Sequence, residues 1–268
     1  MRGTGIRQQL NWMDAPGILL FAAGLTTLLI GVLSAKSAGG ISAGHLILAG
    51  VGLLLLTAFV WHELRAASPF IPLRTFVRYP VMTQVNVEYI LVNLLYYSLF
   101  FGLPSYLQQV RDISEFHTGL LMLSLGLCSL AASPLAGRWI DKSGPRVALF
   151  VSALLMTFGS LLLTMQTAGS SLLGIGIALA AFGISNGLNS VEMQAALFQS
   201  APKEIIGVAS GIFNTSRYFG TILSSLLISI VMGNSFSAGG LRILAVVLTA
   251  VSLSLVVMNR GARNRLNQ

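Results

Sequence analysis

Long uninterrupted runs of apolar residues dominate the chain, and short polar connections separate them. A helix that spans a membrane needs about 20 mainly apolar residues. Eight runs reach this length, and the sequence predicts one transmembrane helix for each: 15–34, 43–61, 81–109, 115–137, 146–166, 170–198, 206–232 and 239–258. The pattern therefore predicts an all-α polytopic membrane protein.

The spacing of these runs predicts two helices followed by six. The longest connection, 62–80, contains Pro69 and Pro72, which interrupt a helix, and its mixed basic and apolar residues suit the cytoplasmic membrane interface. We expect five regions: a cytoplasmic N-terminal segment (1–14), a two-helix insert (15–61), an interfacial linker (62–80), a six-helix bundle (81–258) and a basic cytoplasmic tail (259–268).

Composition excludes the soluble classes. Apolar residues make up 54% of the chain and charged residues 9%, whereas soluble domains carry about 25% charged residues. The net charge of +8 could indicate a nucleic-acid partner if the basic residues formed one soluble face. They are instead spread through the short connections, where they set membrane orientation, so no nucleic-acid partner is expected.

The distribution of Lys and Arg predicts the orientation. With the N-terminus inside, twelve of the 16 basic residues are cytoplasmic, and three (Lys36, Arg111 and Arg242) are outside. Arg217 falls within a span. This strong positive-inside bias predicts a multi-pass protein of the cell membrane with both termini in the cytoplasm.

One connection carries a recognisable order of residues. It reads Gly137-Arg138-Trp139-Ile140-Asp141-Lys142-Ser143-Gly144-Pro145-Arg146. We expect Gly137 to let the helix end pack closely, Gly144 to permit a tight turn and Pro145 to open the next helix. The order Gly-x-x-x-Asp-Lys-x-Gly-x-Arg resembles the cytoplasmic signature loop of the major facilitator superfamily, although the family usually has a basic residue at the position of Pro145.

Further stretches resemble the 14-spanner drug:proton antiporter branch of that superfamily. They are Gly207-Val208-Ala209-Ser210-Gly211 with Asn214, Arg217 and Gly220, the segment Asn11-Trp12-Met13-Asp14-Ala15-Pro16-Gly17, and the linker from Pro69 to Phe76. The resemblance covers essentially the whole chain. Eight helices split two plus six correspond to the last eight of that layout, so the N-terminal six-helix half is expected to be missing from this sequence.

The resemblance implies proton-coupled efflux of drugs or other amphipathic small molecules by alternating access. The implied partners are the substrate, protons, membrane lipid and either the missing N-terminal half or a second copy of the chain. No cofactor is implied. A transport-inactive subunit with an interaction or regulatory role is the alternative.

Polar residues form stripes along three of the predicted helices. At about 100° per residue, Asn86, Asn93 and Tyr97 share one line, as do Asn186 and Met193 with Asn189 at the flank, and Asn214 and Tyr218 with Arg217 at the flank. Polar groups in hydrocarbon are costly, so these residues should face the protein interior or a watery path. They either line a solute path or bond neighbouring helices together, and the sequence leaves both interpretations open.

Charged residues within the spans are few. Arg217 lies about 16 Å from the start of its span and needs an acidic, carbonyl or aqueous partner. Glu88 and Glu192 lie nearer the cytoplasmic ends of their helices; each could carry a proton or pair with a basic loop or with Arg217. The Gly183-x-x-x-Gly187 and Gly207-x-x-x-Gly211 motifs favour close helix packing.

Other chemistry has little support in the sequence. His45, His62 and His117 lie in different connections or span ends and show no metal-ligand spacing. The chain contains no phosphate-binding loop and no nucleophile-elbow motif. We therefore expect a transporter and not an enzyme, with no metal site.

Overall fold

The computed structural model describes residues 14–37, 42–66, 69, 73–166, 171–233 and 236–264. Each of the eight predicted spans forms one helix. They are α2 (Ala15–Ser37), α3 (Ala43–Glu63), α5 (Pro80–Gln109), α6 (Glu115–Ser143), α7 (Pro145–Thr164), α8 (Leu172–Ser200), α9 (Ile206–Met232) and α10 (Ala238–Asn264). Within the described residues, seven of these helices are long and apolar enough to cross a membrane, and α2 contributes a shorter apolar stretch, Ala15–Gly31. The protein is an all-helical polytopic membrane protein.

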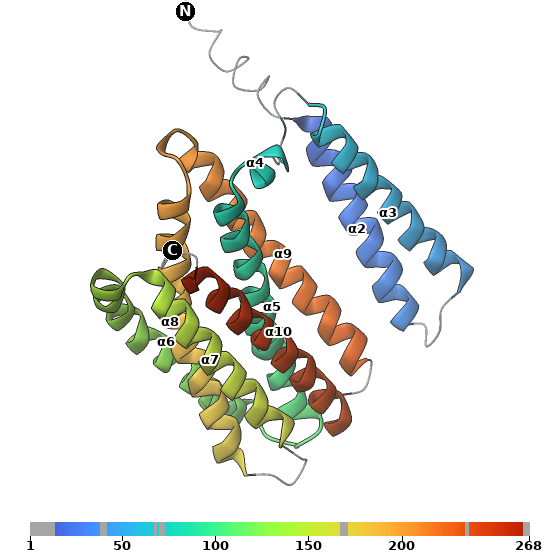
Figure 1. Ribbon diagram of the computed structural model, residues 1–268. Coiled ribbons are helices and arrows are strands. Elements are labelled where there is room, and N and C mark those ends of the chain that lie inside the picture. The colour runs from blue at the N-terminus through green and yellow to red at the C-terminus, as the bar shows by residue number, and fades with distance from the viewer. Residues whose placement is uncertain are drawn as a thin grey trace, which may run out of the picture. The chain divides into compact units, whose positions relative to one another are not determined.

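The chain divides into two compact units, Met1–Thr83 and Gln84–Gln268. In the first unit, α2 and α3 pack along each other as a hairpin (Figure 1). Leu28 of α2 lies very close to Gly52 of α3. A Cβ atom added at Gly52 would meet the Leu28 backbone nitrogen at 2.5 Å. Predicted linker 62–80 contains a short helix, α4 (Leu73–Arg78).

A polar contact closes one end of this hairpin. Asp14 precedes α2, and its carboxylate accepts a hydrogen bond from the Gly17 amide at 3.0 Å. The same Asp14 oxygen lies 2.7 Å from Nε2 of His62, in the last turn of α3. The start of α2 is thereby held to the end of α3.

The second unit is the six-helix bundle that positions the candidate site. In it, α8 packs against both α6 and α7, and α7 packs against α10 (Figure 1). Gly183 and Gly187 allow the close approach of α8 to α6, because a Cβ atom at either position would collide with the carbonyl oxygen of Leu125 or Ser129. This confirms the packing role predicted for that glycine pair.

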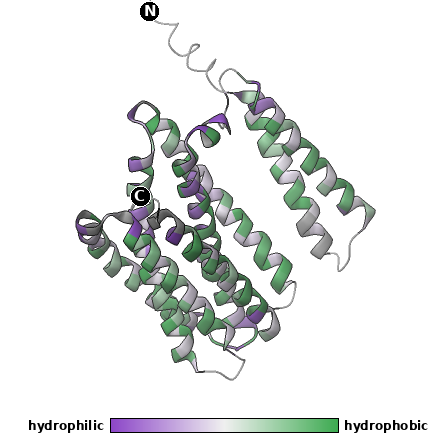
Figure 2. Ribbon diagram, viewed as in Figure 1, coloured by the Kyte–Doolittle hydropathy of each residue, from purple (hydrophilic) through white to green (hydrophobic). Residues whose placement is uncertain are grey.

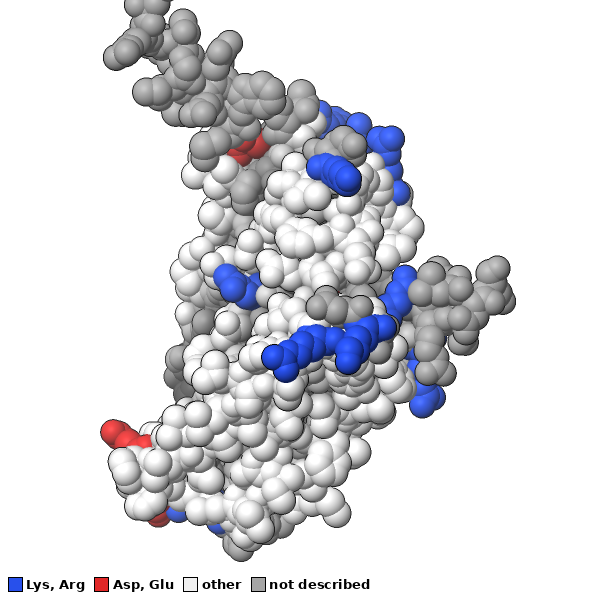
Figure 3. Space-filling view, turned by 90° about the vertical axis from the view of Figure 1, so that its left-hand side faces the viewer, with Lys and Arg blue, Asp and Glu red and all other residues white. Residues whose placement is uncertain are grey.

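Hydropathy follows the same plan. Along the long helices the residues are mostly apolar, and hydrophilic residues concentrate toward their ends (Figure 2). The face drawn in Figure 3 is mostly uncharged, with Lys and Arg gathered in a few patches. Both patterns suit a lipid environment.

The connection predicted at 137–146 is not an open loop. Helix α6 continues through it to Ser143, and only Gly144 separates α6 from α7. Gly144 adopts φ 74°, a conformation that favours glycine, and its amide donates to the Ile140 carbonyl at 2.8 Å. Pro145 is the first residue of α7. The turn and the helix start were predicted, whereas the length of α6 was not, because the charged residues were interpreted as a loop.

Candidate functional site

The two asparagines of the α5 stripe lie inside the bundle. Asn86 is buried, and its side-chain oxygen accepts a hydrogen bond from the Ser216 hydroxyl of α9 at 3.0 Å. Asn93 is buried and donates to the Tyr89 carbonyl of its own helix at 2.7 Å. Its Cβ lies against Gly220 of α9. Both residues therefore belong to the contact between α5 and α9.

The asparagines of the α8 stripe also connect helices. Asn189 is buried; its oxygen accepts from the Ser152 hydroxyl of α7 at 3.0 Å, and its amide donates to Ser185 at 3.2 Å. Ser185 in turn donates to the Ser152 carbonyl at 2.9 Å. Asn186 is half-buried and donates to the Ser129 hydroxyl of α6 at 3.0 Å. These bonds hold α8 to both of its neighbours.

Met193 completes this closed region. It is 1% exposed, and the space that it shares with Val92, Asn189 and Asn259 leaves no room for a water molecule. A solute cannot enter such a space without separating the helices. The helix-bonding interpretation therefore fits Asn86, Asn186 and Asn189, which bond across helices. Asn93 and Met193 are buried in the same interior, and Asn93 bonds within its own helix.

The α9 stripe is different, because its residues face outward from the bundle. Asn214 is exposed and bonds only to the Ser210 carbonyl of its own helix, at 3.1 Å. Tyr218 is 60% exposed. The Arg217 guanidinium lies 5.0 Å from the Tyr218 ring centre and donates to the Tyr218 hydroxyl at 3.3 Å. Arg217 forms no ion pair with an acidic group among the described residues.

Aromatic side chains extend this surface onto α5. Tyr89 stacks on Phe213 of α9 with ring centres 3.8 Å apart, and both Tyr89 and Tyr97 lie within electrostatic range of Arg217. Half-buried Tyr97 also stacks on Phe101 at 5.7 Å. We group the half-buried Tyr97 with the exposed Asn214 and Tyr218 around Arg217, and we call this surface the α9 polar face.

The two glutamates have unlike surroundings. Glu88 on α5 is buried, accepts a hydrogen bond from the Gln84 amide at 2.8 Å and interacts electrostatically with Arg146 at the start of α7. This arrangement fits a structural partner of the basic connection. Glu192 on α8 is fully buried, and neither carboxyl oxygen has a hydrogen-bond partner among the described residues. Neither a basic side chain of the connection nor Arg217 pairs with it there.

The predicted signature segment forms the end of α6 and the start of α7. Ala136 and Ile140 pack with Ala148 of α7 and Leu188 of α8 in one buried cluster. Lys142 is exposed and Arg146 half-buried, and the Asp141 side chain lies outside the described residues. Among the described residues, a Cβ atom at Gly137 would meet nothing within 4 Å, so the predicted close packing at Gly137 is not seen in that part of the chain. The same finding applies to Gly207 and Gly211.

Sequence reasoning missed several residues of this region. Tyr89, Phe213 and Ser216 connect α5 with α9, and Ser129 and Ser152 complete the α8 contacts. Their signal was weak because single serines and aromatic residues are common in membrane helices. The described residues contain no group of three or more metal-ligating side chains.

Comparison with known proteins places the sequence of this chain in a family. Residues 10–225 match the Major Facilitator Superfamily. The chain is 40% identical over 247 residues to the uncharacterized MFS-type transporter YwoD of Bacillus subtilis, covering 92% of this chain and 54% of that protein.

Two relatives from Mycobacterium tuberculosis have names that state a function. The multidrug resistance protein B homolog is 28% identical over 228 residues, covering 84% of this chain and 42% of the relative. The drug efflux pump JefA is 29% identical over 187 residues, covering 70% of this chain and 36% of the relative. The chain thus spans about half or less of the length of these relatives. Together, the family match and the helical architecture show that the chain belongs to the major facilitator superfamily of transporters.

Proposed function

We propose that this chain forms part of a proton-coupled exporter of drugs or other amphipathic small molecules that works by alternating access. The observation that carries the proposal is the α9 polar face. Arg217 and Tyr218 lie near the middle of a 27-residue apolar helix, and the Tyr218 side chain is exposed there. Exposure of such groups to lipid is costly, so this face requires water, substrate or another polar protein surface.

The chemistry of the α9 polar face suits amphipathic solutes. The exposed rings of Phe101 on α5 and Tyr218 on α9 offer flat apolar contacts. The Asn214 amide, the Tyr218 hydroxyl and the Arg217 guanidinium supply hydrogen-bonding groups at the same surface. The positive charge of Arg217 favours anionic or neutral solutes over cations. The names of the mycobacterial relatives support the assignment to drug export.

Glu192 is our candidate for the proton-binding group. A buried carboxylate without a partner is expensive in a membrane protein, whereas a protonated carboxyl is tolerated. Glu192 is one helical turn from Leu188. Leu188 packs in one buried cluster with Ile140 of the signature segment at the end of α6. A change of charge at Glu192 would therefore act next to the contact between α8 and the signature segment.

A second six-helix bundle would complete the site. Superfamily transporters move two such halves against each other about a site near the membrane midplane. We propose that the α9 polar face meets the second half, supplied by an N-terminal half or by another copy of the chain. We further propose a location in the cell membrane with both termini cytoplasmic, as the distribution of basic residues indicates.

Transport driven by an imposed proton gradient tests the proposal. The assay uses inverted membrane vesicles from the cells that naturally produce the protein. When the vesicle interior is acidified, these vesicles should accumulate a fluorescent amphipathic dye. Glu192→Gln should reduce this accumulation to the level of vesicles without the protein, because glutamine cannot exchange a proton. Glu88→Gln is the matched control and should retain most of the transport, since Glu88 already has a hydrogen-bond partner.

The same assay can contradict the proposal at two levels. Transport unaffected by Glu192→Gln would remove Glu192 from proton coupling but leave export intact. A correctly inserted protein that moves no dye of any charge, with or without a proton gradient, would contradict export and favour a transport-inactive subunit.

A further inference from the structure

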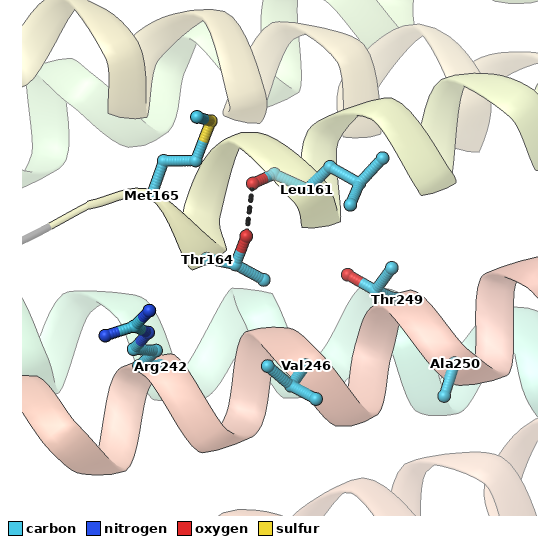
Figure 4. A pocket seen from close by; sticks show the side chains of 7 residues that line it. All are labelled: Leu161, Thr164, Met165, Arg242, Val246, Thr249 and Ala250. Atoms are coloured by element: carbon cyan, nitrogen blue, oxygen red, sulfur yellow. Dashed lines mark hydrogen bonds between the residues drawn. The ribbon is translucent and has the colours of Figure 1, made fainter.

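A groove lies between α7 and α10, at the end of the bundle where α7 finishes and α10 begins. Its volume is about 680 Å³. Leu161 and Met165 form the α7 side, and Val246 and Ala250 form the α10 side (Figure 4). Arg242 lies at the end of the α10 side nearest the start of that helix (Figure 4). The groove is separate from the α9 polar face.

Apart from Arg242, the lining presents apolar groups. The two threonines of the groove use their hydroxyls within their own helices: Thr164 donates to the Leu161 carbonyl at 2.7 Å, and Thr249 donates to the Ala245 carbonyl at 2.8 Å. These bonds satisfy the hydroxyl donors locally. A ligand in the groove would therefore contact an apolar wall along most of its length and a single cation at one end.

Arg242 is available to an anion. It is exposed, and it forms no ion pair with an acidic side chain in the described parts of the chain. It lies about 6 Å along α10, a helix whose first turn contains no acidic residue to offset the positive charge of the helix start. Both charges favour a negatively charged group at this end of the groove. Most basic residues of the chain are predicted to lie on the cytoplasmic side of the membrane, whereas Arg242 is predicted to lie on the outer side.

The length of the groove matches one leaflet of a membrane. Arg242 and Ala250 are eight residues apart, which corresponds to about 12 Å along a helix. Half of the hydrocarbon core of a bilayer is about 15 Å thick. Arg242, close to the helix start, is then at headgroup level, and Val246 and Ala250 follow at the depth of an acyl chain.

We propose that this groove binds an anionic phospholipid, with the phosphate on Arg242 and one acyl chain along Leu161, Val246 and Ala250. An anionic phospholipid fits this groove for two reasons. Its negative phosphate complements the positive charge of Arg242, and the apolar wall is about as long as one leaflet is thick. In the predicted orientation, this lipid belongs to the outer leaflet. The site requires neither transport nor a second bundle.

Native mass spectrometry of the purified full chain tests the proposal. Phosphatidylglycerol and phosphatidylcholine with identical acyl chains are added in equal amounts, and the lipid retained on the protein is measured. The expected result is preferential retention of phosphatidylglycerol, reduced about fivefold by Arg242→Gln, the change that one basic residue near an anionic lipid contributes. Arg260→Gln is the matched control: Arg260 is an exposed arginine near the other end of α10, and this variant should retain the lipid normally.

A second variant tests the acyl-chain part of the groove. Ala250→Phe should fill the exposed apolar wall, leave Arg242 unchanged and also lower retention. Glycerol phosphate, which lacks acyl chains, should not displace the bound lipid. Equal retention of the two lipids by the unmodified chain, or equal loss in Arg242→Gln and Arg260→Gln, would overturn the proposal. Full retention by Ala250→Phe, or displacement by glycerol phosphate, would overturn the acyl-chain contact.

Discussion

Helices α8 and α9 carry similar sequence features but face different surroundings. Each has a Gly-x-x-x-Gly motif and a polar stripe that includes asparagine, yet 56% of the apolar stretch of α8 is buried compared with 22% for α9. The α8 asparagines bond to serines of α6 and α7, whereas Asn214 of α9 is exposed and bonds only to its own helix. Polar residues of one type can therefore bond helices together or form an open surface, depending on the face of the helix that they occupy.

Low burial alone does not distinguish α9 from the other helices of the bundle. Helix α6 is also little buried, with 17% of its apolar stretch inside the bundle, but its exposed large side chains include Leu123, Leu127 and Leu130. Such a face suits lipid or an apolar protein contact. The exposed side of α9 instead includes Asn214 and Tyr218, next to Arg217. Polarity together with exposure distinguishes α9.

The largest expected effect is a difference in stability between variants of the Gly183/Gly187 pair on α8 and the Gly207/Gly211 pair on α9. Gly187→Val should destabilise the bundle by ~3 kcal/mol or more, because the new side chain would press on the Ser129 carbonyl of α6. At the matched position 211, a Cβ atom would have no neighbour within 4 Å among the described residues, so Gly211→Val should change stability by about 0.5 kcal/mol or less. Thermal unfolding of the two variants in the same detergent measures the difference. Equal destabilisation would mean that α9 is packed as closely as α8.

A smaller effect concerns charge selection at the α9 polar face. Arg217→Gln removes the fixed positive charge beside Tyr89 and Tyr97. A unit charge about 8 Å away contributes ~2 kcal/mol at an effective dielectric constant of about 20, so transport should shift at least about tenfold from anionic toward cationic dyes. Arg217→Lys, which keeps the charge, should preserve the original preference. An unchanged preference in Arg217→Gln would place the substrate away from this face.

The smallest effect distinguishes buried from exposed asparagines. Asn189→Ala removes the bonds to Ser152 and Ser185 and should cost ~1 kcal/mol of stability. Asn214→Ala loses only a bond within its own helix and should stay within about 0.5 kcal/mol of the unmodified protein. A double-mutant cycle of Asn189→Ala with Ser152→Ala measures the bond directly. Strict additivity in that cycle would contradict the helix-bonding role of Asn189.

Much of the fold could be predicted from the sequence, because continuous apolar runs determine where membrane helices form. The predicted and observed limits of α9, 206–232, are identical. Helix α6 was predicted too short, since Arg138, Asp141 and Lys142 resemble a polar loop but can also extend a helix beyond the lipid. Gly144 with its positive φ ends the helix, and only the structure shows that this single residue is sufficient.

The candidate site could be predicted only in part. Helical periodicity identifies which residues share a line along α5, α8 or α9, but it does not reveal which neighbour covers that line. Asn189 and Asn214 are both mid-helix asparagines, and the contact between Asn189 and Ser152 joins residues 37 positions apart. Partner identity across such distances depends on how the helices pack. The difference between Glu88 and Glu192 was hidden for the same reason.

The most direct test of a watery path along α9 is the water accessibility of this helix in the native membrane. In a Cys128→Ala background, which removes the single cysteine of the chain, Asn214→Cys and Tyr218→Cys are treated with a membrane-impermeant thiol reagent. Leu127→Cys, on the exposed apolar face of α6, is the matched control. We expect rapid labelling at positions 214 and 218, slowed by an exported dye, and no labelling at position 127. Labelling at positions 214 and 218 as slow as at position 127 would contradict a watery path along α9.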